Sequence, residues 1–158
     1  VFNDIEIGSI SEVEFRNRIK ALAKIEFTDA QIDQAWNAML LDLPKNRLEL
    51  LSSLKASKRT FLLSNTNVIH ARYFEESIRI AHNGTDLKTF FEAAYYSHEM
   101  GLRKPNLAIF NCLIDQHELN PSRTLFIDDS EQHIKGAQLS GLQTHHLTDG
   151  QTIEDLFI

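Results

Sequence analysis

Thr124-Leu125-Phe126-Ile127-Asp128-Asp129-Ser130 is the stretch that decides how the 158-residue chain is organised. Its apolar, β-prone residues run directly into two adjacent carboxylates, which is typical of a buried strand in a parallel sheet. Ligands of open α/β sheets bind in the crevice outside the carboxyl ends of the strands. Adjacent carboxylates repel unless a cation or a shared proton relieves them, and Mg2+ prefers oxygen ligands. The stretch therefore favours a magnesium site at Asp128 and Asp129, although Asp-Asp-Ser also suits a solvated turn.

Short apolar segments alternate with helical segments around this strand. We expect strands at residues 60–63, 93–97, 125–128 and 143–147, and helices at residues 67–81, 105–117 and 131–140. Strands that alternate with helices indicate βαβ units and a parallel sheet. The predicted fold class is therefore α/β, with a Rossmann-like parallel sheet flanked by helices.

Residues 1–42 have a different pattern, with helical signals and no strand between them. Ser11 with Glu14, and Thr28 with Gln31, each form a capping-box signature that marks the start of a helix. A third helix is predicted to begin at Pro44, because proline suits the first helical position. We therefore expect a small helical lobe at 1–42 and an α/β domain at 43–158.

Composition excludes several classes of partner. The net charge of −6 disfavours non-specific binding to nucleic acid or to an anionic membrane. No apolar run approaches the ~20 residues that a membrane-spanning helix needs. The single cysteine, Cys112, cannot form an internal disulfide and fits a reducing compartment such as the cytoplasm.

A second group of polar residues follows the strand predicted at 60–63. In Phe61-Leu62-Leu63-Ser64-Asn65-Thr66-Asn67 a strand ends in a hydroxyl and amides, and a helix then begins. A helix N-terminus is an anion site, and the hydroxyl of Ser64 can add a hydrogen bond to a phosphate oxygen. The alternative is that Asn65 or Thr66 only caps the helix.

A third group contains a lysine beside a predicted helix start. In Gly101-Leu102-Arg103-Lys104-Pro105-Asn106 the long stem of Lys104 allows its cation to reach toward the crevice. The alternative is an ordinary solvated surface lysine.

A hydroxyl, then a lysine, then an acidic pair, each beside a βα junction, resembles the pattern of the haloacid dehalogenase-like (HAD) hydrolase superfamily. The resemblance runs from about residue 10 to the end of the chain. Ser64 matches the second motif of that superfamily, Lys104 the third, and Asp128-Asp129 the fourth. The residue sequences of these motifs are most similar to those of the capped branch that holds glucose-1-phosphate phosphatase-like proteins and the phosphatase-like domain of soluble epoxide hydrolases.

The resemblance implies a Mg2+-dependent phosphatase that acts on a small phosphorylated metabolite through an aspartyl-phosphate. It implies that Ser64, Asn65 and Lys104 bind the phosphoryl group, with Ser64 and Lys104 as catalytic residues. Asp129 is implied as the direct metal ligand, and Asp128 as a ligand or a water-mediated partner. Residues 1–42 would be the C-terminal part of a helical cap.

The first motif of the superfamily, a strand ending in Asp-x-Asp, is absent from this sequence. Asp4 is the one early candidate, and it lacks an acid two residues on. In the family this strand lies in the middle of the sheet, between the strands expected here at 60–63 and 125–128. We therefore expect a longer parent chain with about 40 to 60 further residues, or another strand that fills the gap, and an inactive 158-residue chain.

Two other functions stay open on the sequence alone. One is a catalytically silent HAD-like binding or regulatory module that never had a first motif. The other is a 2-haloacid dehalogenase; since that reaction needs no metal, the acidic pair argues against it.

Overall fold

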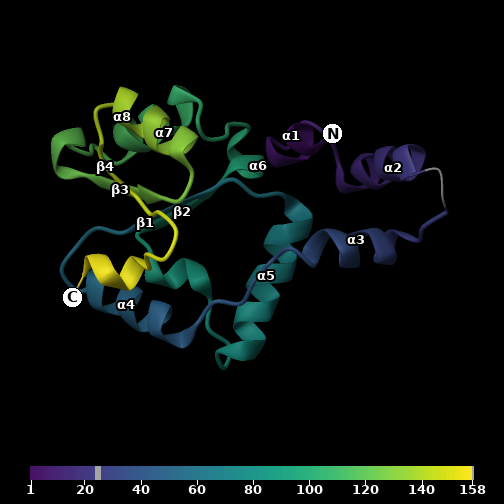
Figure 1. Ribbon diagram of the computed structural model, residues 1–158, viewed down its shortest axis with the longest axis horizontal. Helices are drawn as coiled ribbons and strands as arrows, with labels where there is room; N and C mark the ends of the chain where they lie inside the picture. The colour runs from purple at the N-terminus through teal and green to yellow at the C-terminus, as the bar shows by residue number, and fades with distance from the viewer. Residues whose placement is uncertain (24–25, 158) are drawn as a thin grey trace. The chain divides into compact units, whose positions relative to one another are not determined.

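The computed structural model describes residues 1–23 and 26–157, which form two compact units, Val1–Gly101 and Leu102–Ile158 (Figure 1). Each unit is built around one pair of parallel strands. The predicted α/β class, with parallel strands and flanking helices, is confirmed.

The first unit is mostly helical. Its elements are α1 (Phe2–Glu6), α2 (Glu12–Ala23), α3 (Asp29–Asn37), α4 (Lys45–Lys55), β1 (Phe61–Ser64), α5 (Val68–Ala81), the 3-10 helix η1 (Leu87–Phe90), β2 (Ala93–Tyr96) and α6 (Ser97–Met100). Strands β1 and β2 pair in parallel, with Phe61 opposite Ala93 and Ser64 opposite Tyr96. The chain crosses from one strand to the other through α5 and η1, so this unit contains the predicted βαβ connection.

Helices α1, α2 and α3, which we call the lobe, share a core with the first turn of α5. Ile5, Phe15, Ile32 and Ile69 are buried together in this core. Its edge is aromatic: the ring of Trp36 stacks on His70 with the centroids 4.9 Å apart. The lobe therefore packs against α5 through apolar contacts that join residues far apart in the sequence.

Side-chain caps start two of these helices. The hydroxyl of Thr28 accepts from Gln31 N, and the Gln31 side chain accepts from Thr28 N, so the predicted capping box of α3 is complete. At α5 the cap is Asn67, whose Oδ1 accepts from the N–H groups of Ile69 and His70. The prediction that Asn65 or Thr66 caps α5 is wrong, because the amide of Asn67 reaches both N–H groups.

The second unit contains the acidic strand. Its elements are α7 (Leu107–Gln116), the 3-10 helix η2 (Pro121–Arg123), β3 (Leu125–Asp128), α8 (Glu131–Leu139), β4 (Gln143–His146) and the 3-10 helix η3 (Ile153–Leu156). Strands β3 and β4 pair in parallel, with Leu125 opposite Gln143 and Asp128 opposite His146. Helix α8 connects them and packs on both strands, and α7 packs on α8 (Figure 1).

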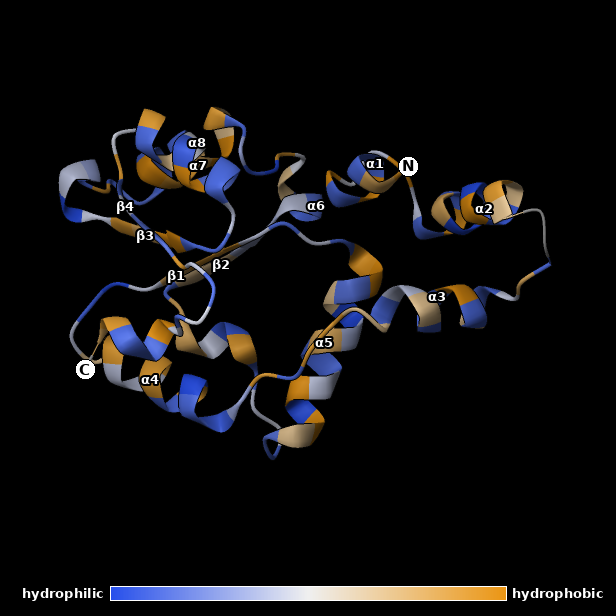
Figure 2. Ribbon diagram, in the orientation of Figure 1, coloured by the Kyte–Doolittle hydropathy of each residue, from blue (hydrophilic) through white to orange (hydrophobic). Residues whose placement is uncertain are grey.

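Apolar side chains of α7 and α8 make the core of this unit, with Ile109, Phe110 and Ala137 fully enclosed. The ring of Phe110 meets Phe126 of β3 edge-on at 5.3 Å. In contrast, β4 is hydrophilic along its length, as Figure 2 shows. Hydrophilic side chains are typical of a strand at the edge of a sheet.

Several details differ from the sequence prediction. Residues Phe2–Glu6 form a short helix, and the carboxylate of Asp4 pairs with Arg18, so Asp4 does not lie at a strand end. Helix α7 begins at Leu107 rather than Pro105, because the side chain of Asn106 accepts from Ala108 N and caps the helix. Helix α4 begins at Lys45, with Pro44 as the preceding cap residue.

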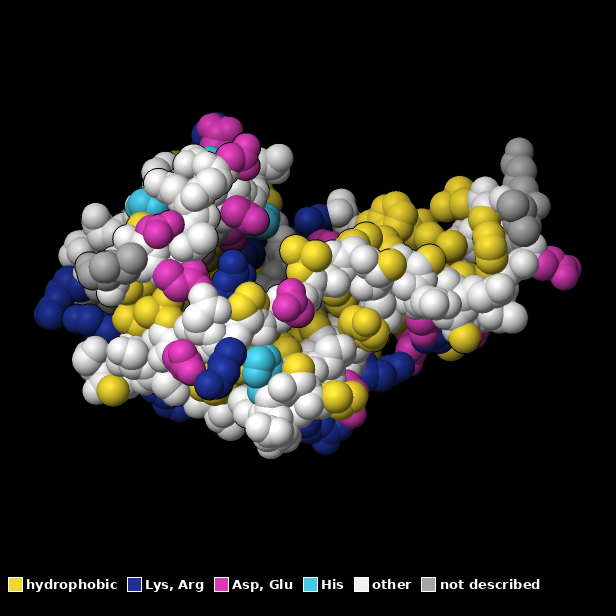
Figure 3. All heavy atoms as spheres, turned by 60° about the horizontal axis from the view of Figure 1, so that its bottom comes forward, with side chains coloured by type: hydrophobic (Ala, Val, Ile, Leu, Met, Phe, Trp, Pro, Cys, Tyr) yellow, Lys and Arg dark blue, Asp and Glu magenta, His cyan; other side chains and the backbone are white. Residues whose placement is uncertain are grey.

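Exposed apolar side chains gather over the lobe (Figure 3), among them Phe2, Val13 and Leu22.

In the described part of the chain, every helix is too short or too polar to cross a lipid bilayer.

Candidate functional site

The end of β3 carries the two carboxylates in different environments. Strand β3 continues its ladder at this point, since Leu147 N donates to the carbonyl of Asp128 at 3.0 Å. The Asp128 side chain is 9% exposed, whereas Asp129, which leaves the strand, is exposed. The end of the strand therefore separates the pair into a buried acid, Asp128, and an exposed acid, Asp129.

Lys104 lies against the buried acid. Its Nζ is 2.7 Å from Oδ2 of Asp128, and the lysine side chain is 8% exposed. The same ammonium lies over the ring of Phe126, 5.4 Å from its centroid. The alternative prediction of a solvated surface lysine is wrong, because Lys104 is enclosed with its counter-charge.

The other carboxylate oxygen of Asp128 is also engaged. Oδ1 accepts from the backbone N–H of Ser130 at 2.9 Å and lies 2.9 Å from Nδ1 of His133. Burial raises the pKa of Asp128, but the charge and hydrogen bond of Lys104, together with Ser130 and His133, lower it further. Asp128 is therefore held as a carboxylate, with a pKa below its ordinary value.

This arrangement predicts a loss of stability in acid. A carboxyl with a depressed folded pKa stabilises the protein above its unfolded pKa, ~3.9, and that contribution is lost as the pH falls through the lower folded pKa. We expect the free energy of unfolding of the protein to exceed that of Asp128→Asn at neutral pH, and the gap to narrow below about pH 4. Urea titrations across this range measure it, with the exposed Asp149→Asn as the control. A constant gap would contradict the assignment.

His133 is a site residue that the sequence alone does not single out, because no motif contains it. It lies in the first turn of α8, directly after the acidic strand. A polar side chain at that position faces back toward the strand end, and this was the available signal. His133 contacts Oδ1 of Asp128, whereas Lys104 contacts Oδ2, so the two residues together hold both oxygens of the carboxylate.

Asp129 is the acid with an open carboxylate for a cation. Its carbonyl oxygen is 3.0 Å from Nε2 of His146, which ties the backbone of Asp129 to β4. Within residues 1–23 and 26–157, no three His, Cys, Asp or Glu side chains are grouped as a metal cage. Mg2+ does not need one, because it keeps several waters and binds through one or two carboxylates plus substrate phosphates. The exposed carboxylate of Asp129 fits this ion, while the carboxylate of Asp128 forms an ion pair with Lys104.

Ser64 and Asn65 lie at the end of β1, in the first unit. Both are partly buried, and the following residue, Thr66, is 5% exposed. The buried hydroxyl of Ser97 accepts from Thr66 N and donates to the Thr66 carbonyl, each at 2.9 Å. The sequence alone does not identify Ser97 as a supporting residue. The one feature that could indicate this role is its position at the end of the strand that pairs with β1. Ser97 holds the Ser64 loop in place.

The internal hydrogen bonds limit where an anion can bind on this loop. The N–H groups of Ile69 and His70 donate to the Asn67 cap, and the N–H of Thr66 donates to Ser97. An anion on this loop would therefore meet the hydroxyl of Ser64 and the amide group of Asn65, rather than the N–H groups of Thr66, Ile69 and His70. This agrees with the predicted role of Ser64 and Asn65, which stays a prediction.

Substituting Ser97 tests this support. Ser97→Ala leaves the buried N–H and carbonyl of Thr66 without the hydroxyl, so we expect a loss of about 1–2 kcal/mol in the free energy of unfolding. The matched control is Ser77→Ala, whose hydroxyl donates to the carbonyl of Tyr73 at an exposed position. Chemical denaturation measures both, and equal effects would contradict a special role for Ser97.

The structure thus brings Lys104 and Asp128 together, adds His133 to them, and places Asp129 beside them on the same strand end. Ser64 and Asn65 belong to the other unit. Their convergence with Lys104 around one phosphoryl group stays a prediction.

Comparison with known proteins gives a consistent family match. A model of haloacid dehalogenase-like hydrolases matches residues 6–141. A D-ribitol-5-phosphate phosphatase from Bacteroides thetaiotaomicron is 29% identical over 150 residues, which are 95% of this chain and 72% of that protein.

Solved structures agree. A HAD family enzyme from Bacteroides thetaiotaomicron, crystallised with magnesium and inorganic phosphate, superposes with a TM-score of 0.91 at 35% identity, over 98% of this chain and 78% of that chain. A HAD-like hydrolase from Porphyromonas gingivalis gives a TM-score of 0.88 at 33% identity, over 98% of this chain and 76% of that one. A dehalogenase at 16% identity, with a TM-score of 0.56, shares the fold.

Proposed function

Because this chain belongs to the haloacid dehalogenase-like hydrolase family, we propose that it carries the phosphate- and magnesium-binding residues of a phosphoric monoester hydrolase. The observation that carries the proposal is the end of β3, where a buried Lys104–Asp128 pair stands beside the exposed Asp129. A fixed cation next to an open carboxylate suits a phosphoryl group bound together with a divalent ion. The relative that acts on D-ribitol 5-phosphate supports a small phosphorylated metabolite, and a polyol phosphate in particular, as substrate.

Each residue has a distinct role in this proposal. Lys104 neutralises charge on the phosphoryl oxygens, and Asp128 and His133 fix the lysine in place. Ser64 and Asn65 donate hydrogen bonds to other phosphoryl oxygens. Asp129 would hold Mg2+, which supplies charge neutralisation when bound. Positioning and electrostatic stabilisation account for most of the catalysis of phosphoryl transfer.

The attacking group of an aspartyl-phosphate route is not among these residues. The sequence has no Asp-x-Asp segment, and among the described residues β1 is paired only with β2, and β3 only with β4. Each therefore keeps one edge on which a further strand can pair. We propose that such a strand, from an N-terminal segment of a longer parent, supplies the nucleophile, and that the 158-residue chain alone does not turn over substrate.

Phosphatase assays test the proposal. We expect the parent protein to hydrolyse p-nitrophenyl phosphate and D-ribitol 5-phosphate only with Mg2+, and Asp129→Ala to reduce turnover about 100-fold or more. Asp149→Ala, a change at an exposed acid of the same unit, should retain full activity. Metal-dependent turnover that survives Asp129→Ala would overturn the metal assignment.

The absence of an Asp-x-Asp segment also supports a second candidate, a silent HAD-like module that binds phosphorylated ligands without turnover. Phosphate binding by the parent without hydrolysis would favour it. A 2-haloacid dehalogenase is disfavoured, since its reaction has no use for a metal at Asp129. A cytoplasmic location is part of the proposal and rests on the single cysteine, Cys112.

A further inference from the structure

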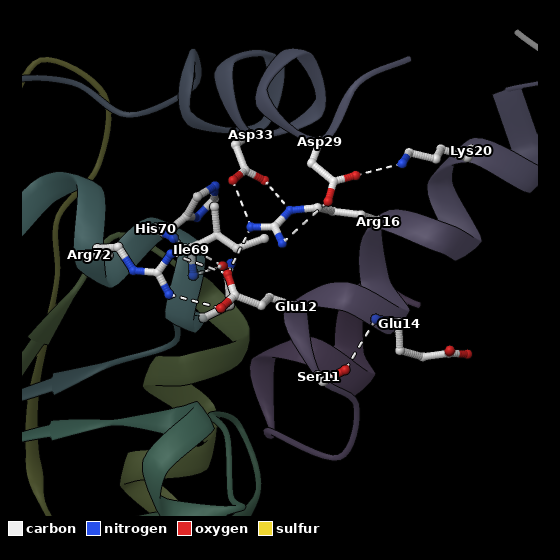
Figure 4. A network of polar contacts seen from close by, with 11 residues as sticks. Ser11, Glu12, Glu14, Arg16, Lys20, Asp29, Asp33, Ile69, His70 and Arg72 are labelled. Carbon is white, nitrogen blue, oxygen red and sulfur yellow. Dashed lines mark hydrogen bonds and ion pairs between the residues drawn. The ribbon is translucent and has the colours of Figure 1, made fainter. Parts of the chain in front are cut away.

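An ion-pair network joins three helices of the first unit (Figure 4). At its centre is Arg16 of α2, whose side chain is 11% exposed. Its Nε and Nη2 donate to the two carboxylate oxygens of Asp33 on α3, both at 2.8 Å. Such a two-pronged contact fixes the geometry of both partners. The two longer helices of the lobe are therefore tied to each other by one nearly enclosed guanidinium.

Glu12 extends this network from the lobe to α5. One of its oxygens accepts from Nη2 of Arg16 at 2.8 Å, and both oxygens accept from Arg72 of α5, at 3.2 and 3.0 Å. The hydrogen bond from Arg72 is the main cause that lowers the pKa of Glu12, so Glu12 stays ionised at neutral pH. Asp33 holds Arg16, and Arg16 in turn holds the Glu12 carboxylate that Arg72 binds.

Two neighbours of Arg72 in α5 also contact the lobe. Ile69 is 3% exposed within the lobe core. The ring of His70 stacks on Trp36, and its Nε2 lies 3.0 Å from the carbonyl oxygen of Trp36. The N-terminal part of α5 thus makes apolar, aromatic and ionic contacts with α2 and α3.

The same turn of α5 follows the Ser64 loop directly. Asn67 caps it by accepting from the N–H groups of Ile69 and His70, and Ser64 stands at the end of the preceding strand. We propose that Glu12, braced by Arg16 and Asp33, is a positioning residue that couples the lobe to the Ser64 loop. Docking of the lobe orders the first turn of α5 and raises the affinity of the loop for phosphate. Coupling of this kind is reciprocal, so phosphate binding also favours the docked lobe.

The coupling rests on the phosphate role proposed for Ser64, but its mechanical part can be measured without phosphate. In Glu12→Gln, we expect amide hydrogen exchange at Ile69 and His70 to be about fivefold faster, the factor for the roughly 1 kcal/mol of a partly exposed ion pair. Exchange near Ile78, in the last turn of α5, serves as an internal reference.

A matched control is available in the same unit. Glu92, which directly precedes β2, pairs with Arg59 through both of its oxygens, at 2.8 and 2.6 Å. Glu92→Gln removes the same charge from the same kind of pair, and exchange at Ile69 and His70 should stay unchanged. Arg72→Gln, at a more exposed position, provides a second variant if Glu12→Gln does not fold, and Arg72→Lys should restore part of the protection.

Inorganic phosphate is the ligand probe. We expect it to slow exchange at Ile69 and His70 in the unsubstituted chain, and to bind about fivefold more weakly to Glu12→Gln but equally well to Glu92→Gln. Unchanged exchange in both Glu12→Gln and Arg72→Gln would overturn the coupling. A third outcome is that exchange is faster in Glu12→Gln while phosphate neither binds nor changes exchange in the unsubstituted chain. That result would overturn the phosphate role of Ser64, but Glu12 would remain the residue that orders α5.

Discussion

Lys104→Met is expected to lower the free energy of unfolding by about 3–5 kcal/mol, the range for removing one partner of a buried ion pair. The change leaves the Asp128 carboxylate, 9% exposed, without the ammonium that lies 2.7 Å from it. Methionine keeps most of the volume and the contact with Phe126, so the loss reports the charge rather than a cavity. Urea denaturation at neutral pH measures it.

The matched control is Lys135→Met on α8. Lys135 forms an ion pair with Glu131 in which both side chains are about two-thirds exposed. Solvent screens such a pair, so its removal should change stability by less than about 1 kcal/mol. The double variant Lys104→Met with Asp128→Leu should recover much of the lost stability, because neither charge then remains buried. Equal losses for Lys104→Met and Lys135→Met would show that the site pair is not buried in solution.

Gly136→Ala is expected to destabilise the second unit by about 3 kcal/mol, at the upper end of the cost of overpacking a core. A Cβ at Gly136 would lie 2.5 Å from the carbonyl oxygen of Pro105 and 2.9 Å from Cε2 of Phe110. The carbonyl is backbone and adjoins Lys104, so the clash is relieved only by moving α8 away from the segment that carries the site lysine, or that segment away from α8.

The sign of this effect makes it diagnostic. In an exposed helix interior, glycine to alanine stabilises by roughly 0.5–1 kcal/mol. A substitution at exposed Gln138 of the same helix, Gln138→Ala, should be close to neutral. A neutral or stabilising Gly136→Ala, measured by thermal or urea unfolding, would show that α8 does not approach Pro105 this closely.

Both predictions concern the packing of α8 against the segment that contains Lys104 and Pro105. Gly136 lets α8 approach the segment after Lys104, while His133 of the same helix contacts Asp128. Helix α8 therefore sets the position of both charged partners, so substitutions there are expected to alter the site and the stability together.

Local sequence signals predicted the elements that position the site. The run from Leu125 into Asp128 is a strand, Thr28 caps α3 through a complete capping box, and α5 ends at Ala81 just before Asn83 and Gly84. These features depend on residues a few positions apart, where backbone preference and side-chain capping act directly. The three polar motifs, at Ser64, Lys104 and Asp128-Asp129, could be recognised for the same reason.

Sequence alone determined the α/β class, the family resemblance and the identity of Ser64, Lys104, Asp128 and Asp129 as candidates. Only the tertiary structure decided that Lys104 is buried against Asp128, that His133 joins them, and that Ser97 braces Thr66. Likewise, only the folded lobe brings Arg72 to Glu12, sixty residues away in the chain. Burial and long-range pairing depend on which distant side chains the packed helices and strands bring together, and no local pattern in the chain encodes that.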